Sequence, residues 1–242
     1  MRDALEVGYR SIDTAQSYFN EEEVGKAIEK SGIDRKEIFL TSKVWIEHFG
    51  YEECKKSVLE SVEKLRTDYL DLLLLHQPFG DTYGAWRALE ELYKEGKLHA
   101  IGISNHYTDR MVEFANFTNI KPMVNQILLH ISNTPMELVE YCQKNNIVVE
   151  AYSPIAHGEI LNQPEITTIA KKYGVTVPQL CIRYTIQLGA ISLPKTGNPE
   201  HMKSNAQLDF EISAEDMELL KNFKKIKSYG NSGNFPVYGG KM

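Results

Sequence analysis

The chain has 242 residues, of which 42% are hydrophobic, and this is enough for one well-buried domain. Its net charge of −6, with acidic and basic residues interspersed, argues against nucleic acid as a partner. No apolar stretch approaches the ~20 residues that span a bilayer. Because no signal peptide opens the sequence either, we expect a cytoplasmic protein with no membrane partner. The three scattered cysteines fit a reducing compartment, and no His/Cys/Glu spacing resembles a metal site.

Short apolar runs recur along the chain, and each is expected to form a strand. The first three are followed by helical periodicity, and the last leads into a short helix from Pro199. This alternation predicts a parallel sheet whose functional site lies at the carboxyl ends of the strands. The expected strands are residues 9–13, 38–43, 70–76, 100–104, 123–126, 148–152 and 190–193.

The first expected strand ends in Asp13, and Tyr18 follows on the next loop. A helix then opens, with Asn20 as its N-cap and Glu23 as the reciprocal partner of a capping box. A carboxylate and a phenol at such a place can carry out proton chemistry. Taken alone, however, a strand-end Asp is more often a turn residue, and a loop Tyr more often covers apolar surface.

Two further residues favour the catalytic interpretation. The second expected strand ends in Lys43 and the third in His76, each at a strand's carboxyl end. Because these ends meet at one edge of a parallel sheet, we expect Lys43 and His76 to lie near Asp13 and Tyr18. Three titratable strand ends in succession have fewer structural explanations than one.

With these residues in place, the chain resembles the aldo-keto reductase superfamily. The resemblance covers about residues 8–217, and the segment HQPFGDTYGAWRALEELYKEGK is similar to the bacterial branch that includes diketogluconate and methylglyoxal reductases. It implies an α/β fold, a (β/α)8 TIM barrel, as a single domain over residues 1–242. It also places the catalytic tetrad of the family on Asp13, Tyr18, Lys43 and His76. The matching motifs are GYRSIDTAQSYFNEEEVGKAI, FLTSKVW, LLLLHQP, GISN, VNQ, AYSP and LPKTGNPE.

The reaction implied by the resemblance is the reduction of an aldehyde or ketone by a nicotinamide hydride. Tyr18 is expected to protonate the oxygen that becomes the alcohol. A phenol ordinarily has a pKa of about 10, and a cation beside it favours loss of its proton. Lys43 would supply that cation, held in place by Asp13. His76 is expected to orient the carbonyl and, with Tyr18, to stabilise developing negative charge.

The nicotinamide positions implied by the resemblance are Ser104, Asn105 and Gln126 for the carboxamide and Tyr152 for stacking on the ring. Side-chain amides can satisfy both ends of a carboxamide, and a flat aromatic supports a flat ring. For Ser104 and Asn105 alone, a turn with a helix N-cap is the commoner explanation.

The segment after the last strand combines Lys195 and Thr196 with the start of a helix, which is a suitable place for a phosphate. The resemblance assigns it to the adenosine 2′-phosphate, which implies NADP(H), with NAD(H) as a second cofactor. His201 stands where the family usually has arginine, so we expect an NADPH preference weakened by about 1–2 kcal/mol, partly compensated by Lys203. The remaining cofactor positions implied by the resemblance are Ser153, Ile155, Gly197 and Asn205.

Aromatic side chains are candidates for the substrate pocket. Trp45, Phe49 and Phe79, with Trp86 as a further candidate, could form an apolar pocket for aromatic aldehydes and small dicarbonyls, although such aromatics are as often packing residues. The Gly- and Tyr-rich tail, residues 229–242, resembles a family segment that often closes over this pocket.

The remaining histidines have ordinary explanations. His48 and His106 are interpreted as solvated loop residues, and His99 as an outward-facing residue at the start of a strand. His130 falls on a histidine often seen in the family, and a structural role is favoured over a chemical one.

Seven strands are visible where a closed barrel needs eight, and comparison with the family indicates that the missing one is the first. Residues 1–7 are interpreted as the end of the first helix. We therefore expect the natural protein to be longer and monomeric, whereas a truly shortened chain could associate through its strand edges.

Two alternatives to a reductase stay open at this point. One is a non-catalytic cofactor-binding relative, or an inactive truncated form. The other is an aldolase or isomerase that uses Lys43 as a Schiff base, which is disfavoured because a neighbouring Asp13 would keep the amine charged.

Overall fold

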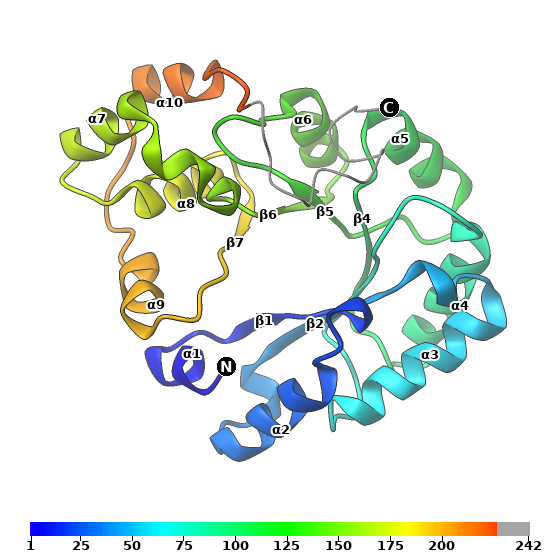
Figure 1. The fold of residues 1–242 in the computed structure, drawn as a ribbon. Coiled ribbons are helices and arrows are strands. Elements are labelled where there is room, and N and C mark those ends of the chain that lie inside the picture. The colour runs from blue at the N-terminus through cyan, green and yellow to red at the C-terminus, as the bar shows by residue number, and fades with distance from the viewer. Residues whose placement is uncertain (227–242) are drawn as a thin grey trace. The chain divides into compact units, whose positions relative to one another are not determined.

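The computed structural model describes residues 1–226. Within them, seven strands neighbour one another in sequence order from β1 to β7 (Figure 1), and the pairs from β1 to β5 and the pair β6–β7 are parallel. Every expected strand is present, with ends within two residues of the expected ones. The strands are β1 (Ser11–Asp13), β2 (Phe39–Val44), β3 (Leu72–Leu75), β4 (Ile101–Ser104), β5 (Val124–Leu128), β6 (Val148–Tyr152) and β7 (Ile191–Leu193).

Helices alternate with these strands, as the periodicity predicts. The first of them confirms the helical interpretation of residues 1–7, while the tail at 229–242 lies outside the described residues. No helix within residues 1–226 combines the length and the apolar character needed to cross a bilayer. The α-helices are α1 (Arg2–Val7), α2 (Glu21–Ser31), α3 (Tyr51–Lys64), α4 (Thr82–Lys94), α5 (Thr108–Phe117), α6 (Met136–Lys144), α7 (Pro164–Lys172), α8 (Val177–Gln187), α9 (Pro199–Ala206) and α10 (Ala214–Lys221), and the 3₁₀ helices are η1 (Gln16–Tyr18), η2 (Arg35–Glu37), η3 (Ile46–His48) and η4 (Ala156–Asn162).

The chain divides into two compact units. Unit 1 comprises Met1–Ile127 and Glu137–Val149, and unit 2 comprises Leu128–Met136 and the chain from Glu150 onward. Unit 1 therefore contains β1 to β4 with all four members of the expected tetrad, and unit 2 contains β7 with the expected phosphate segment. The single domain over residues 1–242 stays a prediction.

The core of unit 1 is built around β3, whose four leucines are all buried. Burying one leucine side chain stabilises a fold by about 1.5–3 kcal/mol, so this strand is an anchor for its neighbours β2 and β4. Helix α4 packs against β3, and α3 lies beside α4 (Figure 1), linked to it by Lys55 and Glu91. Trp86 on α4 is 1% exposed and donates to the carbonyl of Ile120 at 3.0 Å. It belongs to this core, so its assignment to the substrate pocket is wrong.

The start of α2 differs from the expected capping box. Asn20 is the N-cap residue, but its side chain makes no cap hydrogen bond. Its Oδ1 instead accepts from Thr14 Oγ1 at 2.6 Å. Thr14, the residue after β1, therefore competes with the helix N–H groups for the Asn20 side chain. The capping-box pattern covers only residues 20–23, so it could not reveal this competitor. The interaction ties the loop that carries Tyr18 to the end of β1.

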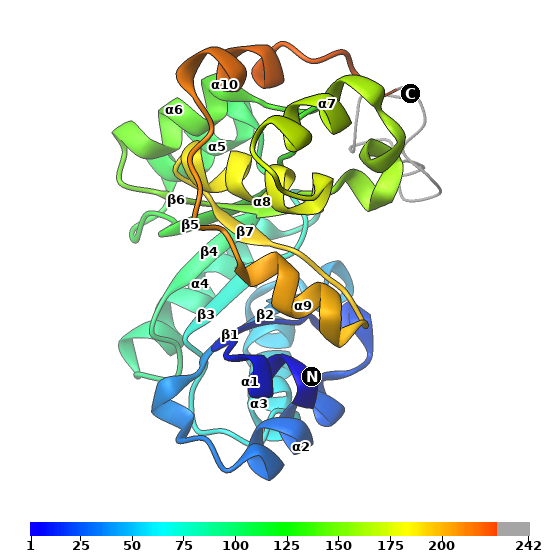
Figure 2. The same ribbon diagram turned by 90° about the vertical axis from the view of Figure 1, so that its left-hand side faces the viewer.

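Unit 2 contains the helices α7, α8 and α10 (Figure 2), and polar side-chain contacts link them. Lys172 and Tyr173, at the end of α7, both contact the buried carboxylate of Asp216 on α10. Gln187, at the end of α8, accepts from the backbone N–H of Ile212 at 2.7 Å and donates to its carbonyl at 3.0 Å. These contacts fix α7 and α8 against α10, and β7 lies next to β6 in the same unit.

Candidate active site

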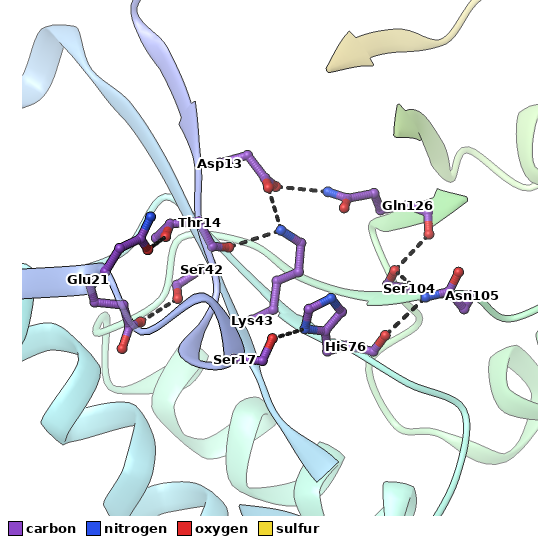
Figure 3. Close-up of polar contacts among 11 residues, drawn as sticks. Asp13, Thr14, Ser17, Glu21, Ser42, Lys43, His76, Ser104, Asn105 and Gln126 are labelled. Carbon is purple, nitrogen blue, oxygen red and sulfur yellow. Dashed lines mark hydrogen bonds and ion pairs between the residues drawn. The ribbon is translucent and has the colours of Figure 1, made fainter. Parts of the chain in front are cut away.

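An ion pair between Lys43 and Asp13 lies at the centre of the site (Figure 3). The Lys43 side chain at the end of β2 is fully buried, and its Nζ donates to Asp13 Oδ1 and, at 2.9 Å, to the carbonyl of Thr14. A buried ammonium is costly unless it is paired and hydrogen-bonded. Asp13, whose side chain is 19% exposed, is this partner, and it lies between the core and solvent. The structure brings the two charges together as the sequence predicts.

Asp13 also holds Gln126. Its Oδ2 accepts a hydrogen bond from Gln126 Nε2 at 2.9 Å, so the two carboxylate oxygens point to different partners (Figure 3). Gln126 lies on β5, 113 residues along the chain from Asp13. The carboxylate therefore orients both the lysine and an amide expected to bind the cofactor.

His76 follows β3, and its backbone is tied in place on both sides. Its N–H donates to the carbonyl of Val44 at 3.1 Å, and its carbonyl accepts from Asn105 Nδ2 at 3.1 Å. Burial, aided by the positive charge of Lys43, lowers the pKa of His76 to about 3. The imidazole is therefore neutral at physiological pH. It can donate one hydrogen bond, but it cannot act as a general acid.

Tyr18 lies on η1 and is 48% exposed, so a substrate can reach its hydroxyl from solvent. Its ring centroid lies 5.7 Å from that of His76, with the planes nearly perpendicular. Lys43 Nζ lies 5.1 Å from the centroid of the Tyr18 ring. The four residues that the sequence singled out thus converge within unit 1.

Several polar residues around the tetrad were not identified from the sequence. Glu21 is 4% exposed, and its carboxylate accepts from Ser42 at 2.5 Å and from Ser61 at 3.2 Å. Gln16 accepts from the backbone N–H of Trp45 at 2.8 Å and donates to Ser61 at 3.1 Å. These contacts hold η1 and β2 to α3. For Gln16, the sequence signal is its place in a run of small and polar residues between Asp13 and Tyr18.

Ser104, Asn105 and Gln126 form one hydrogen-bonded group. The Gln126 carbonyl accepts from Ser104 Oγ at 2.9 Å and from the Asn105 N–H at 3.0 Å. Asn105 has a left-handed backbone, with φ of 62°, which costs a non-glycine residue about 1–2 kcal/mol. The commoner explanation, an N-cap, does not hold because Tyr107 is the N-cap residue of α5.

His106 corrects another expectation. It is fully buried rather than solvated, because its side chain packs edge-on against Phe114 while its Nδ1 contacts the Ser104 carbonyl at 2.9 Å. Burial lowers the pKa of His106 from 6.5 to about 4. His130 is also buried, and its Nδ1 accepts a hydrogen bond from the backbone N–H of Ser132 at 3.2 Å. This contact is consistent with the structural role that the sequence favours.

This burial predicts a pH dependence of stability. Between pH 6.5 and 4 the imidazole of His106 binds a proton when the chain is unfolded but not when it is folded. Its contribution to the free energy of unfolding is complete above pH 6.5 and falls by up to about 1.4 kcal/mol per pH unit below it. Urea denaturation of His106→Gln should therefore show a shallower pH slope over this window. An unchanged slope would mean that His106 is protonated in the folded chain.

In unit 2, the cofactor candidates Ser153 and Ile155 lie on the loop that follows β6. Tyr152 ends β6, and Ser153, with φ of 51°, follows it and lies 3.1 Å from His157 Nε2 through its hydroxyl. Ile155 is the N-cap residue of η4 and is half-buried.

The phosphate segment begins after β7. Thr196 Oγ1 accepts from the N–H of Asn198, and Asn198 caps α9 by accepting from the Glu200 N–H at 2.9 Å. Lys203 contacts Glu200 at 3.0 Å in an exposed ion pair, and its partial compensation for His201 stays a prediction. Lys195, Gly197 and His201 are exposed, and Asn205 is buried.

The aromatic candidates separate into two groups. The Trp45 ring lies edge-on to His76, with centroids 5.2 Å apart. It also lines a small cavity in unit 1, together with Ser17, Phe19 and the polar side chains of α3. Phe49 and Phe79 are half-buried and do not line this cavity. The cavity next to Trp45 is thus lined mainly by polar residues, with Trp45 and Phe19 as its aromatic members.

Comparison with known proteins identifies the family. The aldo/keto reductase family model matches residues 1–225. Glyoxal reductase of Bacillus subtilis (strain 168) is 44% identical over 229 residues, which are 94% of this chain and 83% of that protein.

Solved structures agree with the family model. MGS-M4, an aldo-keto reductase enzyme from a Medee basin deep-sea metagenome library, is 40% identical with a TM-score of 0.89, over 95% of this chain and 89% of that chain. The Bombyx mori aldo-keto reductase AKR2E4, solved in complex with NADP, is 31% identical with a TM-score of 0.90, over 98% and 85%. The expected (β/α)8 barrel class is confirmed, with seven of its strands in residues 1–226. The chain is an NAD(P)H-dependent oxidoreductase and belongs to the aldo/keto reductase family.

Proposed function

We propose that this chain reduces aldehydes and ketones to alcohols, with NADPH as the hydride donor and Tyr18 as the general acid. The observation that carries the proposal is the buried ammonium of Lys43, which Asp13 holds beside the rings of Tyr18 and His76. The reductase relatives and the NADP-bound family member support the same reaction class.

Tyr18 would donate its phenolic proton to the oxygen of the carbonyl as the hydride reaches the carbon. Lys43 Nζ lies 5.1 Å from the centre of the Tyr18 ring. The phenolate left after proton donation would therefore lie close to a positive charge. A positive charge at this place stabilises the negative charge that develops on the phenol oxygen. Asp13 keeps the ammonium charged and aimed at the site.

His76 would orient the carbonyl without acting as the acid. Because its pKa is about 3, its imidazole is neutral under working conditions and can donate one hydrogen bond to the carbonyl oxygen. Tyr18 would thus donate the proton, and His76 would orient the carbonyl group. The two rings would together surround the oxygen on which negative charge develops.

The donor set of unit 1 fits a nicotinamide carboxamide. Gln126 gives its Nε2–H to Asp13, so its Oε1 is the end that would accept from the carboxamide NH₂. Ser104 and Asn105 form the same group, and the strained backbone of Asn105 is typical of a residue held for binding. NADPH supplies the hydride when bound. In unit 2, Tyr152, Ser153 and Ile155 are proposed cofactor contacts on the strength of the family resemblance.

The adenosine 2′-phosphate would bind Lys195, Thr196 and the backbone at Gly197, with Asn205 near the adenine. His201 is exposed and lacks the permanent, forked charge of an arginine. We therefore expect NADPH to bind more tightly than NADH, but by a smaller margin than an arginine would give. Equal affinities for the two cofactors would remove this site from the proposal.

The variant His201→Arg tests the phosphate site. It should tighten NADPH binding by about 5–30-fold, or 1–2 kcal/mol, and leave NADH binding unchanged, because only NADPH carries the 2′-phosphate. Quenching of tryptophan fluorescence measures both affinities. The control is His99→Arg, which adds the same charge at an exposed histidine of unit 1. Equal gains for both cofactors would show a non-specific charge effect.

The proposed substrate class rests on the family resemblance and on the Trp45 ring beside His76. We propose small dicarbonyls and aromatic aldehydes, with Trp45 against the reacting group and Phe49 and Phe79 as further pocket residues. The test is consumption of NADPH with methylglyoxal and with a nitrobenzaldehyde. Turnover of neither substrate would favour a non-catalytic relative. Covalent trapping of Lys43 by borohydride would favour the aldolase alternative, which the Asp13 contact argues against.

A further inference from the structure

We propose that Ser17 selects the tautomer of His76 and thereby makes its Nε2–H the donor to the carbonyl oxygen. The effect on catalysis rests on the proposed reductase function, whereas the tautomer itself is a property of the free protein. Ser17 Oγ lies 3.3 Å from His76 Nδ1 (Figure 3). Within residues 1–226, this is the one hydrogen bond that reaches the imidazole of His76.

A neutral imidazole carries one N–H, which can lie on either nitrogen. If the Ser17 hydroxyl donates to Nδ1, the proton of the ring lies on Nε2. If Ser17 accepts instead, the proton lies on Nδ1 and Nε2 becomes an acceptor. A carbonyl oxygen is itself an acceptor, so only the first arrangement gives the substrate a hydrogen bond from His76.

The surroundings favour donation by Ser17. Among the described residues, His76 Nδ1 is the acceptor within reach of the Ser17 hydroxyl, so this hydrogen bond satisfies both groups. The nearby ammonium of Lys43 adds to burial in lowering the pKa of the His76 imidazole, so the ring is neutral. The neutral ring therefore depends on a hydroxyl, rather than a carboxylate, to fix its tautomer.

Ser17 is held rigidly enough to serve this role. It lies on η1 next to Gln16, whose side chain is pinned by the Trp45 N–H at 2.8 Å and by Ser61 at 3.1 Å. The Trp45 ring also lies edge-on to the imidazole, with ring centroids 5.2 Å apart. The hydroxyl and the ring therefore meet in a preorganised geometry, which makes Ser17 a positioning residue for the reaction.

The direct test is the tautomer of His76 in the free protein, read by ¹⁵N NMR of histidine-labelled chain. His76→Gln identifies the resonances. We expect Nε2–H in the wild-type chain, and a shift toward Nδ1–H in Ser17→Ala. Ser17→Thr keeps the hydroxyl and should restore the wild-type tautomer. Nδ1–H in the wild-type chain, or an unchanged tautomer in Ser17→Ala, would overturn the proposal.

Kinetics provide the second readout. Ser17→Ala should lower kcat/KM by about 2–13-fold, the range of one hydrogen bond, and Ser17→Thr should recover most of this loss. The two proposals fail in different ways. A wild-type chain that does not turn over any carbonyl contradicts the reductase function, whereas the tautomer is measured without turnover. Full activity of Ser17→Ala in an active enzyme contradicts the role of Ser17.

Discussion

Replacing Tyr18 by phenylalanine should lower kcat by about 10²–10⁴-fold and leave the affinity for NADPH nearly unchanged. The change removes one hydroxyl and keeps the ring that faces His76 and Lys43. His76 cannot replace the lost acid, because its pKa of about 3 leaves it without a spare proton near neutral pH. Steady-state consumption of NADPH measures turnover, and tryptophan fluorescence measures cofactor binding.

The matched control for this variant is Tyr93→Phe. It removes the same hydroxyl from a tyrosine near the C-terminal end of α4 in the same unit. We expect wild-type kinetics from this control. If Tyr18→Phe retained wild-type turnover, Tyr18 would have no part in proton transfer.

The second large effect is expected on stability. Asp13→Ala leaves the fully buried ammonium of Lys43 without its carboxylate, and removing one partner of a buried pair typically costs about 3–5 kcal/mol. Lys43→Met should cost less, because Asp13 is partly exposed and keeps its hydrogen bond from Gln126. The double variant should be more stable than Asp13→Ala alone. Urea denaturation followed by tryptophan fluorescence reports on unit 1, where Trp45 and Trp86 lie.

An exposed pair gives the control for this comparison. Glu22 and Lys26 on α2 approach within 2.6 Å, yet both side chains are largely exposed. Glu22→Ala should therefore have little effect, since exposed ion pairs contribute little to stability. A small loss in Asp13→Ala, similar to that in Glu22→Ala, would mean that the ammonium of Lys43 does not depend on Asp13.

The strands and the tetrad could be predicted from the sequence because they are local or periodic features. The leucines of β3 form one continuous run, and Lys43 and His76 stand where such runs end. The carboxyl ends of parallel strands meet at one edge by geometry. Three strand ends could therefore be placed together without knowledge of the side-chain contacts.

The supporting contacts could not be predicted, because they join residues far apart in the chain. Glu21 reads as a first-turn acid of a helix, but it accepts from Ser61, 40 residues later. His106 reads as a loop residue, since the sequence does not show that Phe114 packs over it. Asn20 has the pattern of a capping residue, and Thr14 diverts its side chain. Cytoplasmic localisation and the monomeric state stay predictions.

The central claim is that the ammonium of Lys43 acts through the phenol of Tyr18, and a double-mutant cycle on single-turnover hydride transfer tests it most directly. The rate of NADPH oxidation would be compared for the wild-type chain, Tyr18→Phe, Lys43→Met and the double variant. Residues that act as a unit lose far less together than the product of their separate losses. We predict that Lys43→Met slows the Tyr18→Phe enzyme very little. Losses that multiply would contradict the account, because Lys43 would then act on the reaction independently of Tyr18.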